Sequence, residues 1–160
     1  MSRRALLRSL AAAAFAAATA ASGVARAARP ALYPDPSAAA SDIDAALKAA
    51  TAGNKRVLVD FGGNWCGDCI VLDRIFQQPE NAALLAAHYI VVRVNVGETG
   101  INRNADIAER YGIPLRKGVP ALAVLAADGS VVTSQKNGEF ESMRRTDPNS
   151  INEFLTRWSH

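Results

Sequence analysis

The segment Trp65-Cys66-Gly67-Asp68-Cys69 decides how the chain is interpreted. A short apolar run over 56–61 precedes it, and apolar residues at helical spacing follow it over 70–76. The two cysteines, the only ones in the chain, therefore lie where a strand gives way to a helix. At CxxC spacing the second thiol lies one helical turn from the first, close enough for the two to form a small disulfide.

The position of Cys66 indicates a reactive thiol. It falls at the expected helix N-terminus, where free backbone N–H groups and the helix dipole favour a thiolate over a thiol. The thiolate is the species that attacks disulfides, and such sites lower a cysteine pKa from about 8.5 into the range of roughly 3.5–7.5. We therefore predict that Cys66 is the nucleophile and that Cys69 resolves the mixed disulfide it forms.

Three other interpretations of the cysteine pair stay open at this point. Half of a zinc site would need two further ligands, and the only histidines are His88 and His160, so we expect no metal. A static disulfide would close a very small loop and would constrain the unfolded chain little. The third interpretation is an inactive remnant of a redox site.

Residues 1–27 have the order of segments typical of a secretory signal peptide. Basic residues come first, an alanine-rich apolar stretch covers 10–24, and Ala25-Arg26-Ala27 forms a small-residue cleavage site. Residues 2–8 also resemble a twin-arginine export motif, so both export routes stay open. Either route predicts a periplasmic domain with no stable membrane insertion after cleavage. We expect an exposed, proline-containing leader over 28–40 and a folded domain over 41–160.

The positive charge of the chain belongs to the predicted signal segment. The net charge is +3, and residues 1–27 contain four arginines and no acid, so cleavage would leave −1. The basic balance is therefore no argument for a nucleic-acid partner, and we expect none.

The order of elements after residue 40 predicts an α/β domain with a mixed sheet. Helices are expected over 41–53, 66–77, 80–87, 104–111 and from Pro148 onward, and strands over 57–61, 89–96, 121–126 and 131–135. Asp128-Gly129 indicates a two-residue hairpin turn between the last two strands. Asp147-Pro148 is typical of a helix start.

Together these features resemble the thioredoxin superfamily. Val59-Asp60-Phe61 precedes the motif as the corresponding strand does in thioredoxins, and Trp65 directly precedes the first cysteine. Gly118-Val119-Pro120 precedes a strand and a hairpin, as the cis-proline loop of the family does. The resemblance is closest to secreted bacterial thioredoxin-like proteins, including the periplasmic domains of thiol-disulfide interchange proteins. It implies a thioredoxin fold, with a central mixed β-sheet flanked by helices, a cis-proline loop, and a C-terminal β-hairpin plus helix.

The resemblance also implies roles for individual residues. Asp60 would be the buried acid that takes the proton of Cys69, rather than a solvated strand end. Pro120 would be the cis proline that leaves the backbone at Val119 free to pair with an extended substrate, rather than an ordinary trans proline. Trp65 would shield the site and contribute to docking, with simple packing as the alternative.

The motif departs from thioredoxin between the cysteines, where Gly67 is followed by Asp68 instead of proline. The freed N–H at Asp68 would stabilise the thiolate, whereas its carboxylate would oppose it, so the direction of the redox potential stays open. We expect Arg144-Arg145 to be a solvated turn.

These interpretations predict a periplasmic thiol-disulfide oxidoreductase that reduces protein disulfides, with oxidation as the less favoured direction. It would need no cofactor and would take electrons from a protein donor, for which a membrane dithiol transporter is a candidate. One alternative is a non-catalytic binding module that uses the same loops. The last is a copper(I)-handling protein, disfavoured because Met1 and Met143 are the only methionines.

Overall fold

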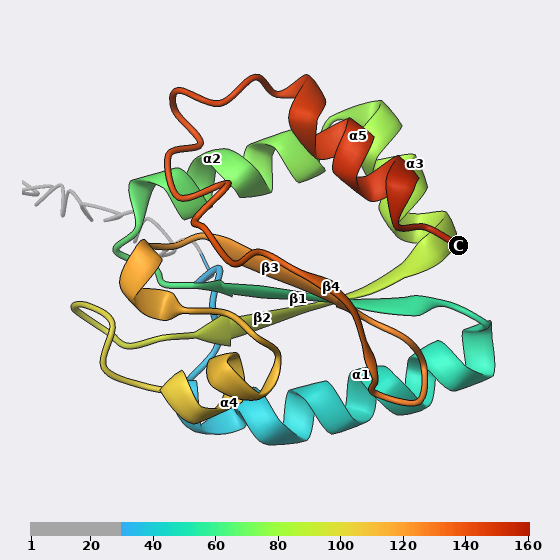
Figure 1. The fold of residues 1–160 in the computed structure, drawn as a ribbon, viewed down its shortest axis with the longest axis horizontal. Coiled ribbons are helices and arrows are strands. Elements are labelled where there is room, and N and C mark those ends of the chain that lie inside the picture. The colour runs from blue at the N-terminus through green and yellow to red at the C-terminus, as the bar shows by residue number, and fades with distance from the viewer. Residues whose placement is uncertain (1–29) are drawn as a thin grey trace, which may run out of the picture.

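A central sheet organises the computed structural model, which describes residues 30–160 (Figure 1). Within these residues the sheet has four strands in the order β2-β1-β3-β4. They are β1 (Arg56–Gly62), β2 (Tyr89–Asn95), β3 (Ala121–Leu125) and β4 (Val131–Ser134). β1 pairs parallel with β2 and antiparallel with β3, and β3 pairs antiparallel with β4. The mixed sheet is therefore confirmed, whereas the predicted signal peptide lies outside the described residues.

Helices cover both faces of the sheet (Figure 1). One face carries α1 (Ala39–Gly53) and α4 (Ala105–Arg110), and the other carries α2 (Gly67–Phe76), α3 (Pro79–His88) and α5 (Asn149–Arg157). Two short 3-10 helices, η1 (Pro36–Ala38) and η2 (Leu115–Lys117), lie in the connections. No helix of the described part is long and apolar enough to cross a membrane.

The central strand β1 is buried on both faces, as its continuous apolar sequence predicts. Val57, Val59 and Phe61 belong to the core beneath α1, whereas Leu58 belongs to the core beneath α2 and α5. Since side chains alternate along a strand, Asp60 and Gly62 share the face of Leu58 and point toward α2. The carboxylate of Asp60 therefore lies near the end of β1 that leads to the cysteines.

The connection between β3 and β4 is longer than the two-residue turn that we predicted. Ala126 and Ser130 close the ladder by a hydrogen bond of 2.9 Å, which leaves residues 127–129 as a three-residue loop. Gly129 has a φ of +86°, the left-handed conformation that such loops require at their last position. The glycine therefore marks the turn correctly but at a different loop length.

The expectation of an exposed leader over residues 28–40 is wrong for part of this segment. Tyr33 is 1% exposed, and Ala39 is buried as the first residue of α1. The helix begins before Ser41, whose hydroxyl donates to the carbonyl of Ala38 within the first turn instead of capping the helix.

Residues 30–38, here called the N-terminal strap, are fixed by side-chain amides. Asn64 and Tyr33 exchange two hydrogen bonds, because the Tyr33 N–H donates to Oδ1 and Nδ2 donates to the Tyr33 carbonyl, both at 2.9 Å. Two further strap carbonyls accept hydrogen bonds of 2.8 Å, those of Pro34 from Asn95 and of Pro36 from Asn104. Prolines cannot donate a backbone hydrogen bond, but their carbonyls still need partners, and the amides supply them.

Candidate active site

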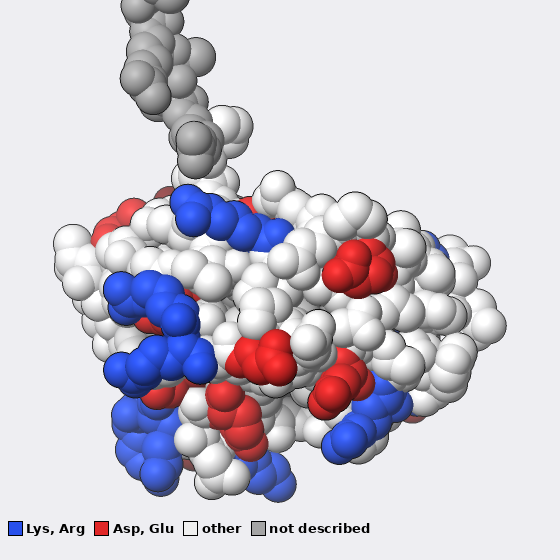
Figure 2. All heavy atoms as spheres, turned by 90° about the horizontal axis from the view of Figure 1, so that it is seen from above, with Lys and Arg blue, Asp and Glu red and all other residues white. Residues whose placement is uncertain are grey.

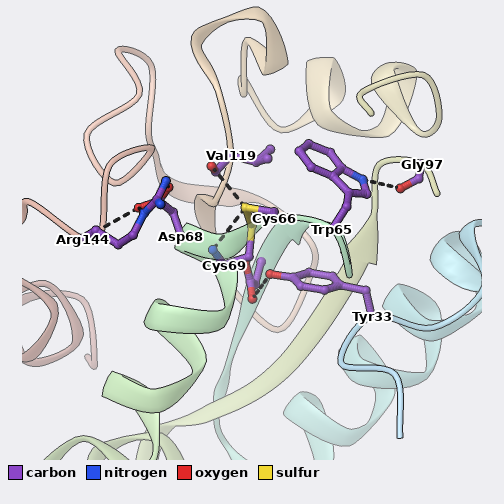
Figure 3. Close-up of a disulfide and its surroundings, with 9 residues drawn as sticks. Tyr33, Trp65, Cys66, Asp68, Cys69, Gly97, Val119 and Arg144 are labelled. Carbon is purple, nitrogen blue, oxygen red and sulfur yellow. Dashed lines mark hydrogen bonds and ion pairs between the residues drawn. A yellow bond between two sulfur atoms is a disulfide. The ribbon is translucent and has the colours of Figure 1, made fainter. Parts of the chain in front are cut away.

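Cys66 and Cys69 form a disulfide at the start of α2 (Figure 3). Their Cα atoms are 5.3 Å apart. Cys66 is the extended N-cap residue of α2, and the backbone N–H of Cys69 donates to its Sγ at 3.1 Å. This backbone donor at the helix end therefore points at the sulfur of Cys66, where it would stabilise a thiolate.

The two cysteines differ in accessibility in the order that their predicted roles require. Cys66 is 6% exposed, whereas Cys69 is fully buried. A partner can therefore approach the sulfur of Cys66, and Cys69 is placed to react only with a group already bound to Cys66.

The proline loop lies directly beside the cysteines. The Val119–Pro120 peptide bond is cis, as the resemblance implies. The carbonyl oxygen of Val119 lies 3.6 Å from Sγ of Cys66 (Figure 3). This geometry places backbone hydrogen-bonding groups next to the sulfur that a substrate would reach.

Trp65 lies on the opposite side of the disulfide from Asp68 (Figure 3). Trp65 is 42% exposed, and its Nε1 donates to the carbonyl of Gly97 at 2.7 Å. A Cβ at Gly63 would lie 2.6 Å from Nε1, so the glycine permits this ring position. The indole is therefore a fixed, exposed aromatic surface at the rim of the site.

Asp60 is 2% exposed, which excludes the solvated strand end. Burial raises the pKa of Asp60 to about 7, while a hydrogen bond from Tyr33 and the positive charge of Arg93 oppose that rise. Within the described residues, Oδ1 of Asp60 has no hydrogen-bond partner. A carboxyl group of this kind changes protonation near neutral pH, as a proton acceptor must.

Tyr33 is the site residue that the sequence reasoning missed. Its hydroxyl donates to Oδ2 of Asp60 at 2.9 Å, and burial beside that carboxylate raises the pKa of the Tyr33 phenol above its usual value. The signal available in the sequence was an apolar pair, Leu32-Tyr33, inside a segment otherwise classed as a leader.

Gly62 explains how these groups come together. A Cβ at this position would lie 2.8 Å from Sγ of Cys69 and would overlap the hydroxyl of Tyr33. The face of β1 that carries Asp60 is therefore open at Gly62, and the tyrosine hydroxyl and the buried sulfur occupy that space (Figure 3).

Asp68 forms an ion pair with Arg144, which corrects our expectation of a merely solvated turn at 144–145. The guanidinium donates from Nη2 to Oδ2 at 2.8 Å and from Nε to Oδ1 at 3.1 Å, and the backbone N–H of Arg144 donates to Oδ1 at 2.9 Å. These hydrogen bonds hold the pKa of Asp68 below its usual value. The positive charge therefore offsets the carboxylate that the sequence places between the cysteines.

The surroundings of the site combine a groove with charges of both signs. An open groove of about 810 Å³ borders the proline loop and is lined by residues of α4, η2 and the segments next to them, including Ile113, Pro114 and Gly118. Figure 2 shows the face over α2, α3 and α5 with basic and acidic side chains interspersed.

Among residues 30–160, no three His, Cys, Asp or Glu side chains gather in a metal-binding arrangement.

The fold and the CxxC disulfide beside a cis proline define a thiol-disulfide oxidoreductase of the thioredoxin class. The family model described as Thioredoxin-like matches residues 38–127, and the chain belongs to this family. Tyr33 and Arg144 both lie outside the matched residues.

Two relatives of known class are similar to the chain in sequence. It is 29% identical over 121 residues to the thiol:disulfide interchange protein DsbD of Pseudomonas fluorescens, which covers 74% of this chain but only 18% of that protein. It is 35% identical over 83 residues to a thioredoxin of Chlorobaculum thiosulfatiphilum, covering 49% of this chain and 63% of the relative.

Solved structures agree with this assignment. A disulphide isomerase from Xylella fastidiosa superposes with a TM-score of 0.74 at 33% identity, covering 81% of this chain and 97% of that one. The C-terminal domain of Neisseria meningitidis DsbD in the oxidised form has a TM-score of 0.53 at 20% identity, covering 78% and 97%, and is similar in fold.

Proposed function

We propose that this protein is a periplasmic thiol-disulfide oxidoreductase that reduces disulfides in protein substrates. One observation carries the proposal: the Cys66–Cys69 disulfide lies at a helix N-terminus, beside the cis Val119–Pro120 bond. The buried Asp60 lies on β1, two residues before the glycine that Sγ of Cys69 approaches. These are the parts that nucleophilic attack, substrate pairing and proton removal require.

The cycle has two exchange steps. The Cys66 thiolate attacks one sulfur of a substrate disulfide, which releases one substrate thiolate and leaves a mixed disulfide. Cys69 then loses its proton to Asp60 and attacks Sγ of Cys66, which releases the second substrate thiolate and forms Cys66–Cys69. The substrate gains two electrons, and a protein dithiol must return them to the cysteine pair.

The comparisons support a reducing role that depends on a partner. The relatives include a thioredoxin and a thiol:disulfide interchange protein, and the latter is much longer than this chain. A membrane dithiol transporter is therefore our proposed electron donor. The signal-like residues 1–27 support the periplasmic location.

Catalysis is tested with the purified domain and single cysteine variants. Wild-type protein should accelerate the reduction of insulin by dithiothreitol, Cys66→Ser should abolish that activity, and Cys69→Ser should accumulate mixed disulfides. Retained cellular function in Cys66→Ser would instead establish the non-catalytic binding module.

Direction is tested by the reduction potential of the Cys66–Cys69 pair in glutathione buffers. A value near that of thioredoxin, about −270 mV, supports a reductant, whereas a value near that of DsbA, about −120 mV, would show that the protein introduces disulfides.

Export is tested by fusing residues 1–27 to a reporter active only in the periplasm. Replacing Arg3 and Arg4 by lysine distinguishes the twin-arginine route, which requires both arginines.

A further inference from the structure

We propose that Tyr33 is a positioning residue for the second exchange step: its hydroxyl holds Asp60 through Oδ2, so that the free Oδ1 accepts the proton of Cys69. The inference rests on the proposed function and deepens it. It assigns part of the proton chemistry to a residue that lies before the family match.

The carboxylate of Asp60 offers two unequal oxygens. Oδ2 accepts the 2.9 Å hydrogen bond from Tyr33, whereas Oδ1 is buried and has no partner among the described atoms. A buried carboxylate oxygen without a donor is costly when charged, so it readily binds a proton. The hydroxyl thus orients the carboxylate and determines which oxygen remains basic.

The buried thiol lies on the same side of β1 as this carboxylate. Asp60 and Gly62 are two residues apart on one strand face, and Sγ of Cys69 lies 2.8 Å from where a Gly62 Cβ would be. The hydroxyl of Tyr33 occupies the same space. The phenol of Tyr33 therefore links the two groups, because it donates to the carboxylate and lies in the same buried space beside Gly62 as the sulfur.

Charged groups from two elements also act on Asp60. Arg93, its register neighbour on β2, favours the ionised form, and Asp73 of α2 disfavours it. These two side chains form an ion pair with each other at 2.6 Å. From the strap side, the facing titratable group is Tyr33, and from the start of α2 it is Cys69 once reduced. Tyr33 donates directly to Asp60. Removing its hydroxyl therefore takes a donor from the ionised carboxylate and should raise the pKa of Asp60.

The strap is built to hold the tyrosine in place. Asn64, one residue before Trp65, bonds both backbone groups of Tyr33, and the tyrosine side chain is almost fully buried. Two polar contacts on the backbone and one on the hydroxyl fix the phenol at both ends. A residue needed only to fill space would not require the hydroxyl.

In the proposed step the S–H bond of Cys69 breaks and an O–H bond forms at Oδ1 of Asp60. The Cys69 thiolate attacks Sγ of Cys66, the Cys66–substrate bond breaks, and the substrate leaves as a thiolate. Tyr33 keeps its own proton throughout and donates to Oδ2 before and after the transfer.

The test compares Tyr33→Phe with wild type in the rate of the second step as a function of pH. Without the hydroxyl, Asp60 should stay protonated to higher pH, so the midpoint of the profile should rise by about one pH unit and the rate at pH 7 should fall about fivefold. The pKa of Asp60, followed by carboxyl ¹³C NMR in the oxidised protein, should rise with it. Tyr89→Phe is the matched control, because its buried hydroxyl donates to the carbonyl of Leu155, within the other core.

The outcomes separate this inference from the proposed function. A wild-type protein that reduces no disulfide would overturn the proposed function, while the NMR titration would still test the Tyr33–Asp60 contact. An active wild type whose profile and Asp60 pKa are unchanged by Tyr33→Phe would overturn the positioning role. If Tyr33→Phe does not fold, 3-fluorotyrosine at position 33 replaces it. Its more acidic phenol is a stronger donor and should lower the midpoint, and an unmoved midpoint would overturn the inference equally.

Discussion

Arg144 holds Asp68 by three hydrogen bonds across 76 residues of sequence. The contact attaches the loop between β4 and α5 to the first turn of α2. It places a positive charge next to the carboxylate that stands where thioredoxins have proline. The charge at the redox motif is therefore set by two residues together rather than by Asp68 alone.

Replacing Arg144 by alanine should lower the reactivity of reduced Cys66. The unpaired carboxylate of Asp68 would then oppose the thiolate at the N-terminus of α2. Because Arg144 is largely exposed, the effect should be modest, about a twofold slower alkylation at pH 7 and low salt. Arg145→Ala is the control, since Arg145 bonds the hydroxyl of Ser142 and acts on Asp68 only through its charge, so its loss should have a smaller effect. An equal loss in both variants would contradict a specific role for the Asp68 pair.

Asp60 should make the oxidised protein less stable as pH rises. Its pKa is about 7 in the folded protein and about 3.9 when unfolded, so between these values the folded state binds the extra proton. The stabilisation is full below about pH 4 and is lost as the pH rises through about 7. Asp60→Asn should remove this dependence and be more stable at pH 8, on the order of 1.4 kcal/mol for each unit of pKa shift. Urea unfolding at pH 5 and pH 8 checks the sign, and parallel losses in both proteins would refute it.

Gly62→Ala should damage both stability and the second exchange step. The new Cβ would overlap the Tyr33 hydroxyl and would lie 2.8 Å from Sγ of Cys69, so one of them must move, at a cost of about 1–3 kcal/mol. Thermal unfolding measures the loss, and trapped mixed disulfide measures the slower resolution. Gly100→Ala is the control, because its Cβ would meet no described atom within 4 Å. Equal melting temperatures for the two variants would rule out the close approach.

Trp65→Ala should slow the reduction of protein disulfides more than that of a small disulfide. The indole is exposed at the rim and fixed by Gly97, so it can contact a folded substrate without taking part in sulfur exchange. The comparison is between rates with insulin and with a dithiobenzoate reagent. Val131→Ala removes a similarly exposed apolar side chain from β4 and should change neither. A uniform loss with both substrates would assign Trp65 to packing.

Local patterns in the sequence predicted the parts of the site that neighbouring residues determine. The CxxC motif and the apolar strand follow from spacing, whereas the buried Asp60 and the cis Val119–Pro120 bond follow only from the family resemblance. Tyr33 and Arg144 did not, because each reaches the site only through the tertiary fold. The tyrosine lies 27 residues from Asp60, and the arginine lies in the connection between β4 and α5, 76 residues from Asp68.

The prediction of an exposed leader is wrong at Tyr33 and Ala39 for a related reason. Proline-rich sequence normally indicates exposure because proline cannot join a hydrogen-bonded ladder. Here the side chains of Asn64, Asn95 and Asn104 satisfy the strap carbonyls, and nothing in the spacing of these asparagines reveals their shared partner.

Because of the strap, the region matched by the family model and the region that supplies the site residues begin at different positions. A domain cut at residue 38, where the family match begins, would keep the sheet, the disulfide and the proline loop. It would lose the phenol that bonds Asp60. Transplanting a domain that begins at residue 38 and runs to the end of α5 would therefore carry over the scaffold and its sulfur chemistry, but with a differently tuned acid. For this chain, the segment needed for the proposed proton transfer therefore includes Tyr33 and is longer than the segment that contains the sheet and the disulfide.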